Sequence, residues 1–491
     1  MKVAFFNSHI LWPTHYETEL ELIMSHQESG DEVTQLYCHA DLPACDINPY
    51  MEPEACFRCI SKREEGYKAL TQPVQTRRFL QLTEADKRKI ASVKKDFSSI
   101  ADLQLLTVDN FDIGYAISSS IISQHRNPSP ELNKKMVENY IIGSLGVYYS
   151  MLNYIQKEKP DRIYVFNGRL AHPKAVLRAC QRMNVECAIH ERGGTKERFS
   201  VFMNTSIHDL DNTRREIHKM WENTDSVERE AIADEFYTSR MGGKSTNWYS
   251  FTNEQKDELP EGFDHSKENI AIFNSSEDEF ASIGSDWKNT IYENQLTGIL
   301  KMIEDSEKLE GIHLYLRMHP NLRNVNNSDS ERLRSLTGKN FTLILPEAPI
   351  SSYNLMMRAS KVLTFGSSIG VEATYFGKPS ILAGMCFYRG LDVAYEPANH
   401  EAVMALLPQK LAPKEKTGAL IYGLYFSRFG QLFRFYKPID FGSGTFNGVV
   451  VAPKLNRYQR LIKRMLESKK LSEVAERYRW NFKKRVLKKY V

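Results

Sequence analysis

Two serines in the stretch TFGSSIGVEATYFGKPS, residues 364–380, have a setting that suits phosphate binding. Ser367 and Ser368 follow a short apolar run, and helix-forming residues begin directly after them. The amides at the start of a helix are unpaired and carry the positive end of its dipole, so with two hydroxyls beside them they attract phosphate oxygens. The alternative is that one serine only caps the helix and binds no ligand.

Other polar residues follow apolar runs elsewhere in the second half of the chain. Ser275 and Ser276 come after one such run, and Arg317 and His319 end another. An arginine offers a planar fork for phosphate, and a histidine can donate a hydrogen bond to the oxygen of a departing group. Glu372 lies one helical turn beyond the serine pair, where a carboxylate can accept hydrogen bonds from ribose hydroxyls. A lone strand-end arginine is often only a surface ion pair, but the joint order of these residues indicates one site for a phosphorylated ligand.

The elements that must position these residues alternate between short apolar strands and amphipathic helices. This alternation is typical of an α/β fold in which helices cover both faces of a parallel sheet. Ligands bind at the carboxyl ends of the strands in such sheets, which is where the polar residues fall. The expected strands are 1–6, 32–38, 162–169, 185–194, 268–280, 312–320, 341–347 and 361–365, and the expected helices are 14–28, 131–157, 172–183, 209–242, 287–304 and 372–376.

The length of the chain predicts more than one domain, because 491 residues exceed what a single core usually contains. A polar stretch over residues 252–267 is the expected boundary. The predicted domains are 1–255, with a cysteine-containing insertion at 38–60, and 256–410, followed by a basic and aromatic extension at 411–491.

Composition and charge are those of a soluble globular protein, with 42% hydrophobic and 26% charged residues. The net charge of +4 is small for this length and does not favour nucleic-acid binding. No segment approaches the roughly 18 uninterrupted apolar residues of a membrane-spanning helix. The start, MKVAFFNSHILW, is a poor signal peptide because polar residues interrupt it early. We therefore expect a cytoplasmic protein with reduced cysteines.

Four of the seven cysteines lie close together in the N-terminal part of the chain. Cys56 and Cys59 form a C-x-x-C pair, and with Cys38 and Cys45 they could supply four thiolates to a structural zinc ion. A zinc ribbon would have two such pairs, so buried free thiols are the alternative.

The segments RMHPN, residues 317–321, and TFGSSIGVEATYFGKPSI, residues 364–381, resemble the C-terminal domain of the capsule polysaccharide biosynthesis proteins. These are bacterial glycosyltransferases that include the Kdo transferases. The resemblance covers about residues 269–381. It implies a GT-B architecture, in which two Rossmann-like domains face a central cleft and the C-terminal one holds the nucleotide-sugar donor. It also implies that His319 touches the donor phosphate, that Ser367 and Ser368 bind phosphate, and that Glu372 holds the nucleotide.

The function implied is transfer of a sugar from a nucleotide-sugar to a growing surface glycan, such as capsule, exopolysaccharide or lipopolysaccharide. The chain lacks the phosphate loop of nucleotide hydrolases and a strict G-x-G-x-x-G after its first strand. It also has no clear D-x-D pair, so we expect an inverting transfer that needs no metal and no cofactor beyond the nucleotide-sugar. A nucleotide-sugar epimerase of the same architecture and a non-catalytic glycan-assembly subunit are the alternatives.

An inverting transfer needs a general base that takes the acceptor hydroxyl proton. The N-terminal half carries the segments FNGR and HERGG, and the best candidates lie in the second of these. We expect Glu191 to be the base, with His190 as its neighbour. The alternative is that Glu191 pairs with Arg192 or Arg169 and serves structure only.

The end of the chain is strongly basic, since residues 454–491 carry fourteen Lys or Arg against three Glu. A helix over residues 456–487 would present these cations around a set of apolar side chains. Such a helix could lie on an anionic inner-membrane surface, where a lipid-linked glycan acceptor would be found. The alternative, compatible with the first, is that the helix packs back on the N-terminal domain.

Overall fold

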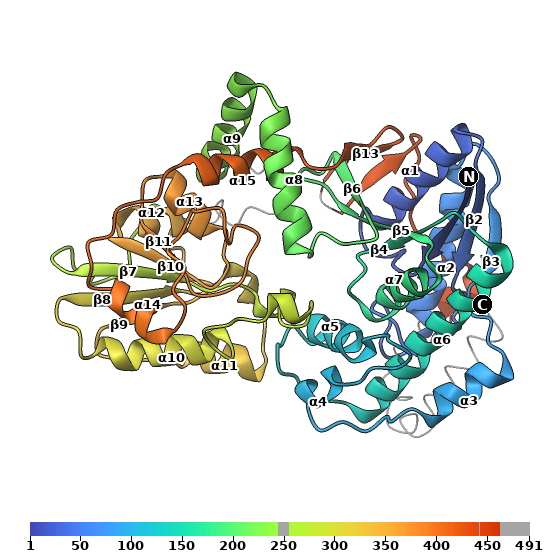
Figure 1. Ribbon diagram of the computed structural model, residues 1–491, viewed down its shortest axis with the longest axis horizontal. Helices are drawn as coiled ribbons and strands as arrows, with labels where there is room; N and C mark the ends of the chain where they lie inside the picture. The colour runs from blue at the N-terminus through green and yellow to red at the C-terminus, as the bar shows by residue number, and fades with distance from the viewer. Residues whose placement is uncertain (244–254, 441, 462–491) are drawn as a thin grey trace. The chain divides into compact units, whose positions relative to one another are not determined.

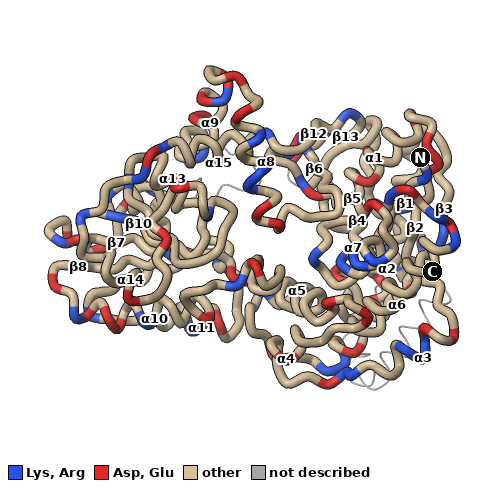
Figure 2. The backbone as a smooth tube through the Cα atoms, in the orientation of Figure 1, with Lys and Arg blue, Asp and Glu red and all other residues tan. Residues whose placement is uncertain are grey.

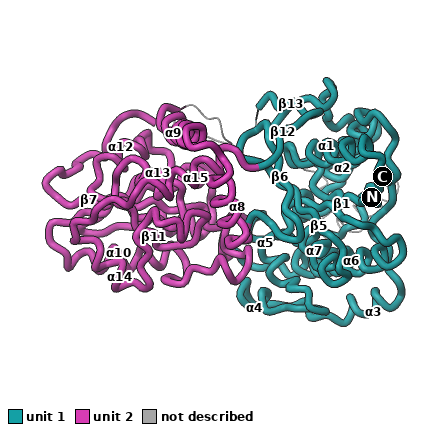
Figure 3. Tube along the Cα trace, turned by 45° about the horizontal axis from the view of Figure 1, so that its top comes forward, with its two compact units in different colours: residues 1–124, 130–207, 430–491 teal, residues 125–129, 208–429 magenta. Residues whose placement is uncertain are grey.

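The structure is a computed structural model that describes residues 1–243, 255–440 and 442–461. The described residues group into two compact units (Figure 3). Unit 1 comprises 1–124, 130–207 and the described residues from 430 onward. Unit 2 comprises 125–129 and the described residues of 208–429.

Unit 1 is built on a seven-stranded sheet with the strand order β12-β6-β5-β4-β1-β2-β3. The five strands from β5 to β3 in this order run parallel, and β6 and β12 are added antiparallel at one edge. The strands are β1 (Lys2–Asn7), β2 (Glu32–Tyr37), β3 (Gln75–Arg78), β4 (Arg162–Phe166), β5 (Glu186–Arg192), β6 (Arg198–Met203) and β12 (Gln431–Leu432).

Helices cover both faces of this sheet because the central strands are apolar on both sides (Figure 1). Strand residues of one face, such as Phe6 and Val165, share a core with α5, α6 and α7. Those of the other face, such as Phe5 and Val33, pack against α1. The helices of unit 1 are α1 (His15–Glu28), α2 (Pro53–Ala69), α3 (Glu84–Ser92), α4 (Ile100–Gln104), α5 (Ile113–His125, whose last residue belongs to unit 2), α6 (Lys134–Glu158) and α7 (Ala171–Met183).

Unit 2 is built on a five-stranded sheet that is parallel throughout, with the order β11-β10-β7-β8-β9. Its strands are β7 (Glu268–Phe273), β8 (Ile312–Arg317), β9 (Phe341–Ile344), β10 (Lys361–Thr364) and β11 (Ser380–Leu382). Counted along the chain, this is the 3-2-1-4-5 order of a Rossmann-like sheet. The predicted α/β class with parallel sheets is therefore confirmed in each unit.

Helices lie on both faces of the sheet of unit 2 (Figure 1), and two separate apolar layers hold them there. Ile272 and Leu316 belong to the layer with α10, α11 and α14, and Ala271 and Val362 to the layer with α12 and α13. The helices of unit 2 are α8 (Leu210–Asn223), α9 (Ser226–Met241), α10 (Gln295–Ser306), α11 (Ser328–Arg334), α12 (Ser352–Arg358), α13 (Ile369–Tyr375), α14 (His400–Leu406) and α15 (Thr417–Arg428).

One expected helix begins later than the sequence predicts. The pattern favoured a helix from residue 287, but α10 starts at Gln295. Asn294 determines this start, because its side chain accepts a hydrogen bond from the N–H of Thr297 at 2.8 Å. Trp287 instead lies in a 3-10 turn and is buried.

The two compact units meet at residues 207/208 and 429/430, whereas the expected domain boundaries were at 255/256 and 410/411. Helices α8 and α9 group with unit 2 because both pack against α15. The hydroxyl of Tyr237 donates to the carbonyl of Ala419 at 2.5 Å, and its ring stacks on Tyr375 with the centroids 4.2 Å apart. Acidic and basic residues are interspersed along both helices (Figure 2), and the sequence of this charged region shows no catalytic pattern.

The described residues after α15 return to unit 1. β12 pairs with β6, and a hairpin of β13 (Tyr436–Pro438) and β14 (Gly444–Phe446) follows. The buried carboxylate of Glu21 accepts the N–H groups of Arg434, Phe435 and Tyr436 at 2.7 to 3.0 Å, which ties this segment to α1. Most of the expected helix over 456–487 lies outside the described residues. Within the described ranges, none of the helices has the length and apolar character needed to cross a bilayer.

Candidate functional site

The strand order of unit 2 brings the two serine pairs together. β7 and β10 are neighbours, and the chain leaves them toward opposite ends of the sheet, which makes their carboxyl ends a topological switch point. Loops diverge at such a point and leave a crevice where ligands bind. Ser275 and Ser276 follow β7, and Ser367 and Ser368 follow β10.

A cavity of about 200 Å³ opens at this point. Both serine pairs and His319 contribute to its wall, so five of the seven predicted donor-binding residues line one space. No Lys or Arg is among its lining residues, so its polar character comes from hydroxyls, an imidazole and one carboxylate. The lining residues are Ser275, Ser276, Glu279, Phe280, His319, Gly366, Ser367, Ser368, Cys386, Phe387, Tyr388 and Tyr422.

The two serines after β7 have different hydrogen-bonding states. The side-chain amide of Gln295 clamps Ser275, since its Oε1 accepts the Ser275 N–H and its Nε2 donates to the Ser275 hydroxyl, both at 2.9 Å. The hydroxyl of Ser276 is buried and makes no hydrogen bond with the described part of the chain. A buried hydroxyl without a partner is costly, and a ligand oxygen in the cavity would satisfy it.

His319 is held in a defined position and protonation state. Its backbone N–H donates to Oδ1 of Asn274 at 2.9 Å, and its Nδ1 accepts the N–H of Asn321 at 3.2 Å. Because Nδ1 is the acceptor, the neutral ring carries its proton on Nε2. Burial and the positive charge of Arg317 lower the pKa of His319 to about 4. At neutral pH the ring is therefore a neutral donor and not a cation.

The loop after β10 depends on a glycine and a tyrosine. Gly366 has a φ of 125°, and a Cβ at this position would lie 2.6 Å from the carbonyl oxygen of Met385. Tyr388 donates its hydroxyl hydrogen to the carbonyl of Ser367 at 2.9 Å. The path of the chain into the serine pair is thus fixed from both sides.

Ser368 does not cap α13 with its side chain, although it stands at the N-cap position. Its hydroxyl instead donates to Oε1 of Glu372 at 2.9 Å. Glu372 is only 2% exposed, forms an ion pair with Arg240 at 3.1 Å, and accepts a hydrogen bond from Tyr353. The predicted contact of Glu372 with a ribose is therefore corrected, because this carboxylate binds protein groups and does not line the cavity.

Arg317 also lies elsewhere than the sequence predicts. Its guanidinium donates to the backbone carbonyls of Leu345 and Ala348, the second at 3.1 Å, and it is buried. Burial lowers the pKa of Arg317 to about 10. The predicted phosphate fork is corrected, because this side chain secures the loop after β9 and is not among the residues that line the cavity.

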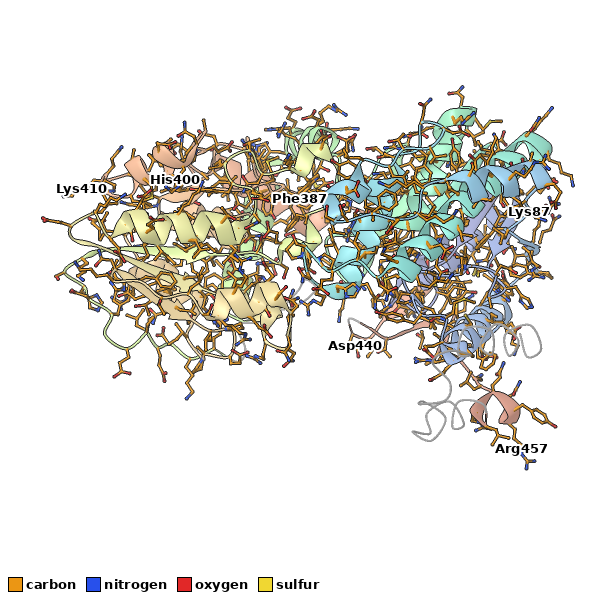
Figure 4. All side chains as sticks on the ribbon, turned by 90° about the horizontal axis from the view of Figure 1, so that it is seen from below. Lys87, Phe387, His400, Lys410, Asp440 and Arg457 are labelled. Atoms are coloured by element: carbon orange, nitrogen blue, oxygen red, sulfur yellow. The ribbon has the colours of Figure 1, made fainter. Side chains whose placement is uncertain are left out.

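Aromatic side chains form the remaining wall of the cavity. Phe387, labelled in Figure 4, packs edge-on against Trp287 with the centroids 5.1 Å apart. Trp287 in turn stacks on Phe280 at 5.2 Å. A space lined by both hydroxyls and aromatic rings suits a ligand that has both an anionic and an apolar part.

Beside the cavity, the carboxylate of Glu277 accepts the backbone N–H of Gln295 at 3.1 and 3.2 Å. This contact holds the residue that clamps Ser275. Burial, with Asp329 and Asp278 nearby, raises the pKa of Glu277 to about 8.

In unit 1, the predicted base Glu191 is the penultimate residue of β5 and is half-buried. Its Oε2 accepts the side-chain N–H of Asn167 at 2.9 Å, and its Oε1 lies 3.8 Å from Nδ1 of His15. Burial raises the pKa of Glu191 above its ordinary value. A carboxylate with a raised pKa takes up a proton more readily, which suits the predicted role. His190 is fully buried, with its Nε2 3.5 Å from the carboxylate of Glu19.

The possible zinc site is not formed. Among the residues that the structure describes, no group of three or more His, Cys, Asp or Glu side chains is arranged to hold a metal ion. Cys38, Cys45, Cys56 and Cys59 are free thiols, and burial raises the pKa of each, to about 12 for Cys56. Of the two readings of this cluster, the positions of these partly buried cysteines favour free thiols.

Several residues of the site were not predicted, because they reach it from distant positions in the sequence. Gln295 opens a helix 19 residues after Ser276, and Tyr388 follows β11; neither is part of a motif. Arg240 lies in the charged region that carries no pattern. Asn274 could have been found, since it directly precedes the first serine pair at a predicted strand end.

No protein-family model and no curated protein sequence matches the chain. Among solved structures, it is similar to the beta Kdo 2,4 transferase KpsC of Thermosulfurimonas dismutans, with 13% identity and a TM-score of 0.36 over 55% of this chain and 80% of that one. The UDP-GlcNAc 2-epimerase of Methanocaldococcus jannaschii is also similar, with 13% identity and a TM-score of 0.27 over 86% of this chain and 98% of that one. For the glycosyltransferase SnogD of Streptomyces nogalater the identity is 10% and the TM-score 0.23, over 87% of this chain and 94% of that one.

Proposed function

We propose that the protein is a glycosyltransferase that takes a sugar from a nucleotide-sugar and adds it to a growing bacterial surface glycan. The observation that carries this proposal is the cavity at the switch point of unit 2, which Ser275, Ser276, His319, Ser367 and Ser368 line together. A crevice at this place in a parallel sheet suits the phosphate of a nucleotide. The resemblance of residues 317–321 and 364–381 to capsule polysaccharide biosynthesis proteins supports the same class.

In this proposal the donor phosphate lies against the neutral Nε2–H of His319 and the free hydroxyl of Ser276. Both groups donate hydrogen bonds, and negative charge grows on the bridging phosphate oxygen as the sugar leaves. Donors that are fixed before the reaction stabilise that charge without reorganising. Two hydrogen bonds supply this preorganisation: His319 donates its backbone N–H to Asn274, and its Nδ1 accepts the N–H of Asn321.

The acceptor hydroxyl has to lose a proton during an inverting transfer. We assign this step to Glu191, whose raised pKa brings its basicity closer to neutral pH. The electrons of the acceptor oxygen form the new bond to the anomeric carbon while the bond to the phosphate oxygen breaks. Glu191 takes the proton, and the nucleotide leaves with the electron pair.

We further propose that the reaction needs no divalent metal, because hydrogen-bond donors at the leaving phosphate can take over charge stabilisation. Full activity in excess EDTA is the expected result. Activity that is lost in EDTA and restored by Mg²⁺ or Mn²⁺ would contradict this part of the proposal and leave the reaction class intact.

A thermal-shift screen with CMP, UDP, GDP and CDP tests the proposed function first. At least one nucleotide should raise the melting temperature, since a ligand that binds only the folded state stabilises it. Incubation of the protein with the corresponding nucleotide-sugars and a glycan acceptor should then release free nucleotide. A sugar that changes without an acceptor would indicate an epimerase, and binding without turnover would indicate a glycan-assembly subunit.

The acceptor is proposed to be a glycan or lipid-linked glycan at the cytoplasmic side of the inner membrane. The fourteen Lys or Arg among residues 454–491 support contact with anionic lipids. The full chain should sediment with vesicles that contain phosphatidylglycerol and not with phosphatidylcholine vesicles. Deletion of residues 483–491 should weaken this sedimentation, and an unchanged result would remove the proposed membrane contact.

A further inference from the structure

A single arginine from outside the sheet holds the second serine pair of unit 2. Nη2 of Arg240, near the end of α9, donates to the hydroxyl of Ser368 at 3.2 Å and lies 3.1 Å from Oε1 of Glu372. The Glu372 side chain is 2% exposed and that of Arg240 is 29% exposed. The negative charge of Glu372 raises the pKa of Arg240 above its ordinary value although burial opposes it, so the arginine stays a cation at all working pH values.

In these contacts the Ser368 hydroxyl acts both as a donor and as an acceptor. Its hydrogen is donated to Glu372, and one lone pair accepts from Arg240. A hydroxyl has only one hydrogen, so Ser368 cannot donate to a phosphate while it donates to Glu372. The hydroxyl of Ser276, in contrast, is buried and has no hydrogen-bond partner within the described part of the chain. Ser368 therefore contributes to the site through the position of its backbone.

The carboxylate at the centre of this network has a second fixed partner. Tyr353 of α12 donates to Oε2 of Glu372, while Arg240 and Ser368 share Oε1. The three groups come from α9, α12 and the loop before α13. Removal of Arg240 would leave the buried charge of Glu372 without its ion-pair partner, which destabilises the fold. The carboxylate and the serine loop therefore keep one position.

We propose that Arg240 is a positioning residue for the donor site: it fixes the loop 366–368 through Ser368 and Glu372, and it touches no substrate. The inference rests on the proposed function, since it concerns the same cavity. It assigns a role to a helix whose sequence shows no catalytic pattern. Loss of the arginine would let the loop move, so the hydrogen-bond donors of the cavity would no longer be in place before the nucleotide binds.

The test uses the single variants Arg240→Met and Ser368→Ala and the double variant that carries both substitutions. Isothermal titration with the nucleotide that gives the largest shift among CMP, UDP, GDP and CDP measures Kd for each variant. Each single variant is expected to raise Kd about tenfold, and the double variant also about tenfold, because both substitutions break the same link. A hundredfold rise in the double variant would show independent effects and overturn the proposal. Arg240→Lys should recover part of the affinity.

A matched control is Arg229→Met on the same helix. Arg229 contacts Trp221, with its guanidinium 4.2 Å from the ring centroid and a hydrogen bond of 3.0 Å to the Trp221 carbonyl. This variant removes a comparable arginine contact away from the cavity, so Kd should stay unchanged. Equal losses of affinity in both arginine variants would show a general effect of α9 on folding and contradict a positioning role for Arg240.

A second measurement needs no ligand and separates this proposal from the proposed function. Hydrogen–deuterium exchange of the nucleotide-free protein should show faster exchange in peptides that cover residues 365–372 of Arg240→Met, with peptides of β7 and β8 unchanged. If the wild-type protein binds no nucleotide but this local change occurs, the proposed function fails and the link stands. Exchange that is unchanged at residues 365–372 would overturn the link itself.

Discussion

Oδ1 of Asn274 accepts the backbone N–H of His319 at 2.9 Å, and this bond joins the loops that follow β7 and β8. The ring of His319 and the hydroxyl of Ser276 therefore line one cavity although 43 residues separate them in the chain. His319 also accepts the N–H of Asn321 on Nδ1, which places the proton of the neutral ring on Nε2. Two donors of different chemistry, a hydroxyl and a neutral imidazole, thus share one ligand space.

Ser276→Ala should weaken nucleotide binding without lowering stability. The Ser276 hydroxyl is buried without a partner, so its removal should leave the free energy of unfolding unchanged or raise it by up to about 1 kcal/mol. Kd for the best-binding nucleotide should rise about tenfold, because a hydrogen bond to a charged phosphate is lost. Urea unfolding and isothermal titration measure the two quantities.

Ser275→Ala is the matched control for this prediction. The Ser275 hydroxyl accepts a hydrogen bond from Gln295 at 2.9 Å, so its loss leaves a buried amide donor unpaired. This variant should lose about 1 kcal/mol of stability, in contrast to its neighbour. Equal stability losses in both variants would mean that Ser276 has a partner within the folded protein.

His319→Gln should reduce nucleotide affinity by the same factor at pH 6.0 and pH 7.5. The pKa of His319 is about 4, so the ring is neutral at both pH values and donates as a neutral group. The expected loss is about tenfold for one hydrogen bond to phosphate. The ratio of variant to wild-type Kd is the quantity to compare, because the titration of the nucleotide itself cancels in it. A ratio that grows at pH 6.0 would show that the ring binds as a cation.

Glu277→Gln should flatten the dependence of stability on pH. The pKa of Glu277 is raised to about 8 by burial, whereas a glutamate in an unfolded chain titrates near about 4.3. Between these values the folded state holds a proton that the unfolded state has lost, so stability falls as pH rises through this window. The slope from this group is at most about 1.4 kcal/mol per pH unit.

Thermal unfolding from pH 5.5 to 8.5 checks this prediction. The wild-type protein should lose stability toward pH 8.5, and Glu277→Gln should lose less. Glu331→Gln, on an exposed position of α11, is the control and should follow the wild type. Parallel pH curves for wild type and Glu277→Gln would show that the carboxyl group is ionised throughout the range.

Glu191→Gln should lower kcat by about a hundredfold or more and leave nucleotide affinity unchanged. A general base contributes about 10² to 10⁴ in rate, and the amide keeps the hydrogen bond to Asn167 without the ability to take a proton. Initial rates at saturating donor and acceptor measure kcat. Near-normal turnover would remove Glu191 from the reaction and leave it a structural partner of Asn167 and His15.

The sequence by itself determined the α/β class and the nature of the strand ends. The short run from Lys361 to Thr364 predicts a buried strand, and it forms β10. The glycine and two serines that follow predict a tight loop, in which Gly366 has a positive φ. Parallel strands carry their ligands at the carboxyl edge, so the joint appearance of Ser276, His319 and Ser367 in one cavity followed from local pattern and sheet geometry.

Tertiary structure alone decided what each charged side chain binds. Arg317, Glu372 and Arg240 are indistinguishable from surface charges in the sequence, because a charge reveals nothing about its partner until distant segments pack. The fold places Arg317 against carbonyls of the β9 loop and joins Glu372 to an arginine 132 positions earlier in the chain. Local sequence patterns determine backbone conformation. The partner of a long side chain depends instead on contacts between elements that lie far apart in the sequence.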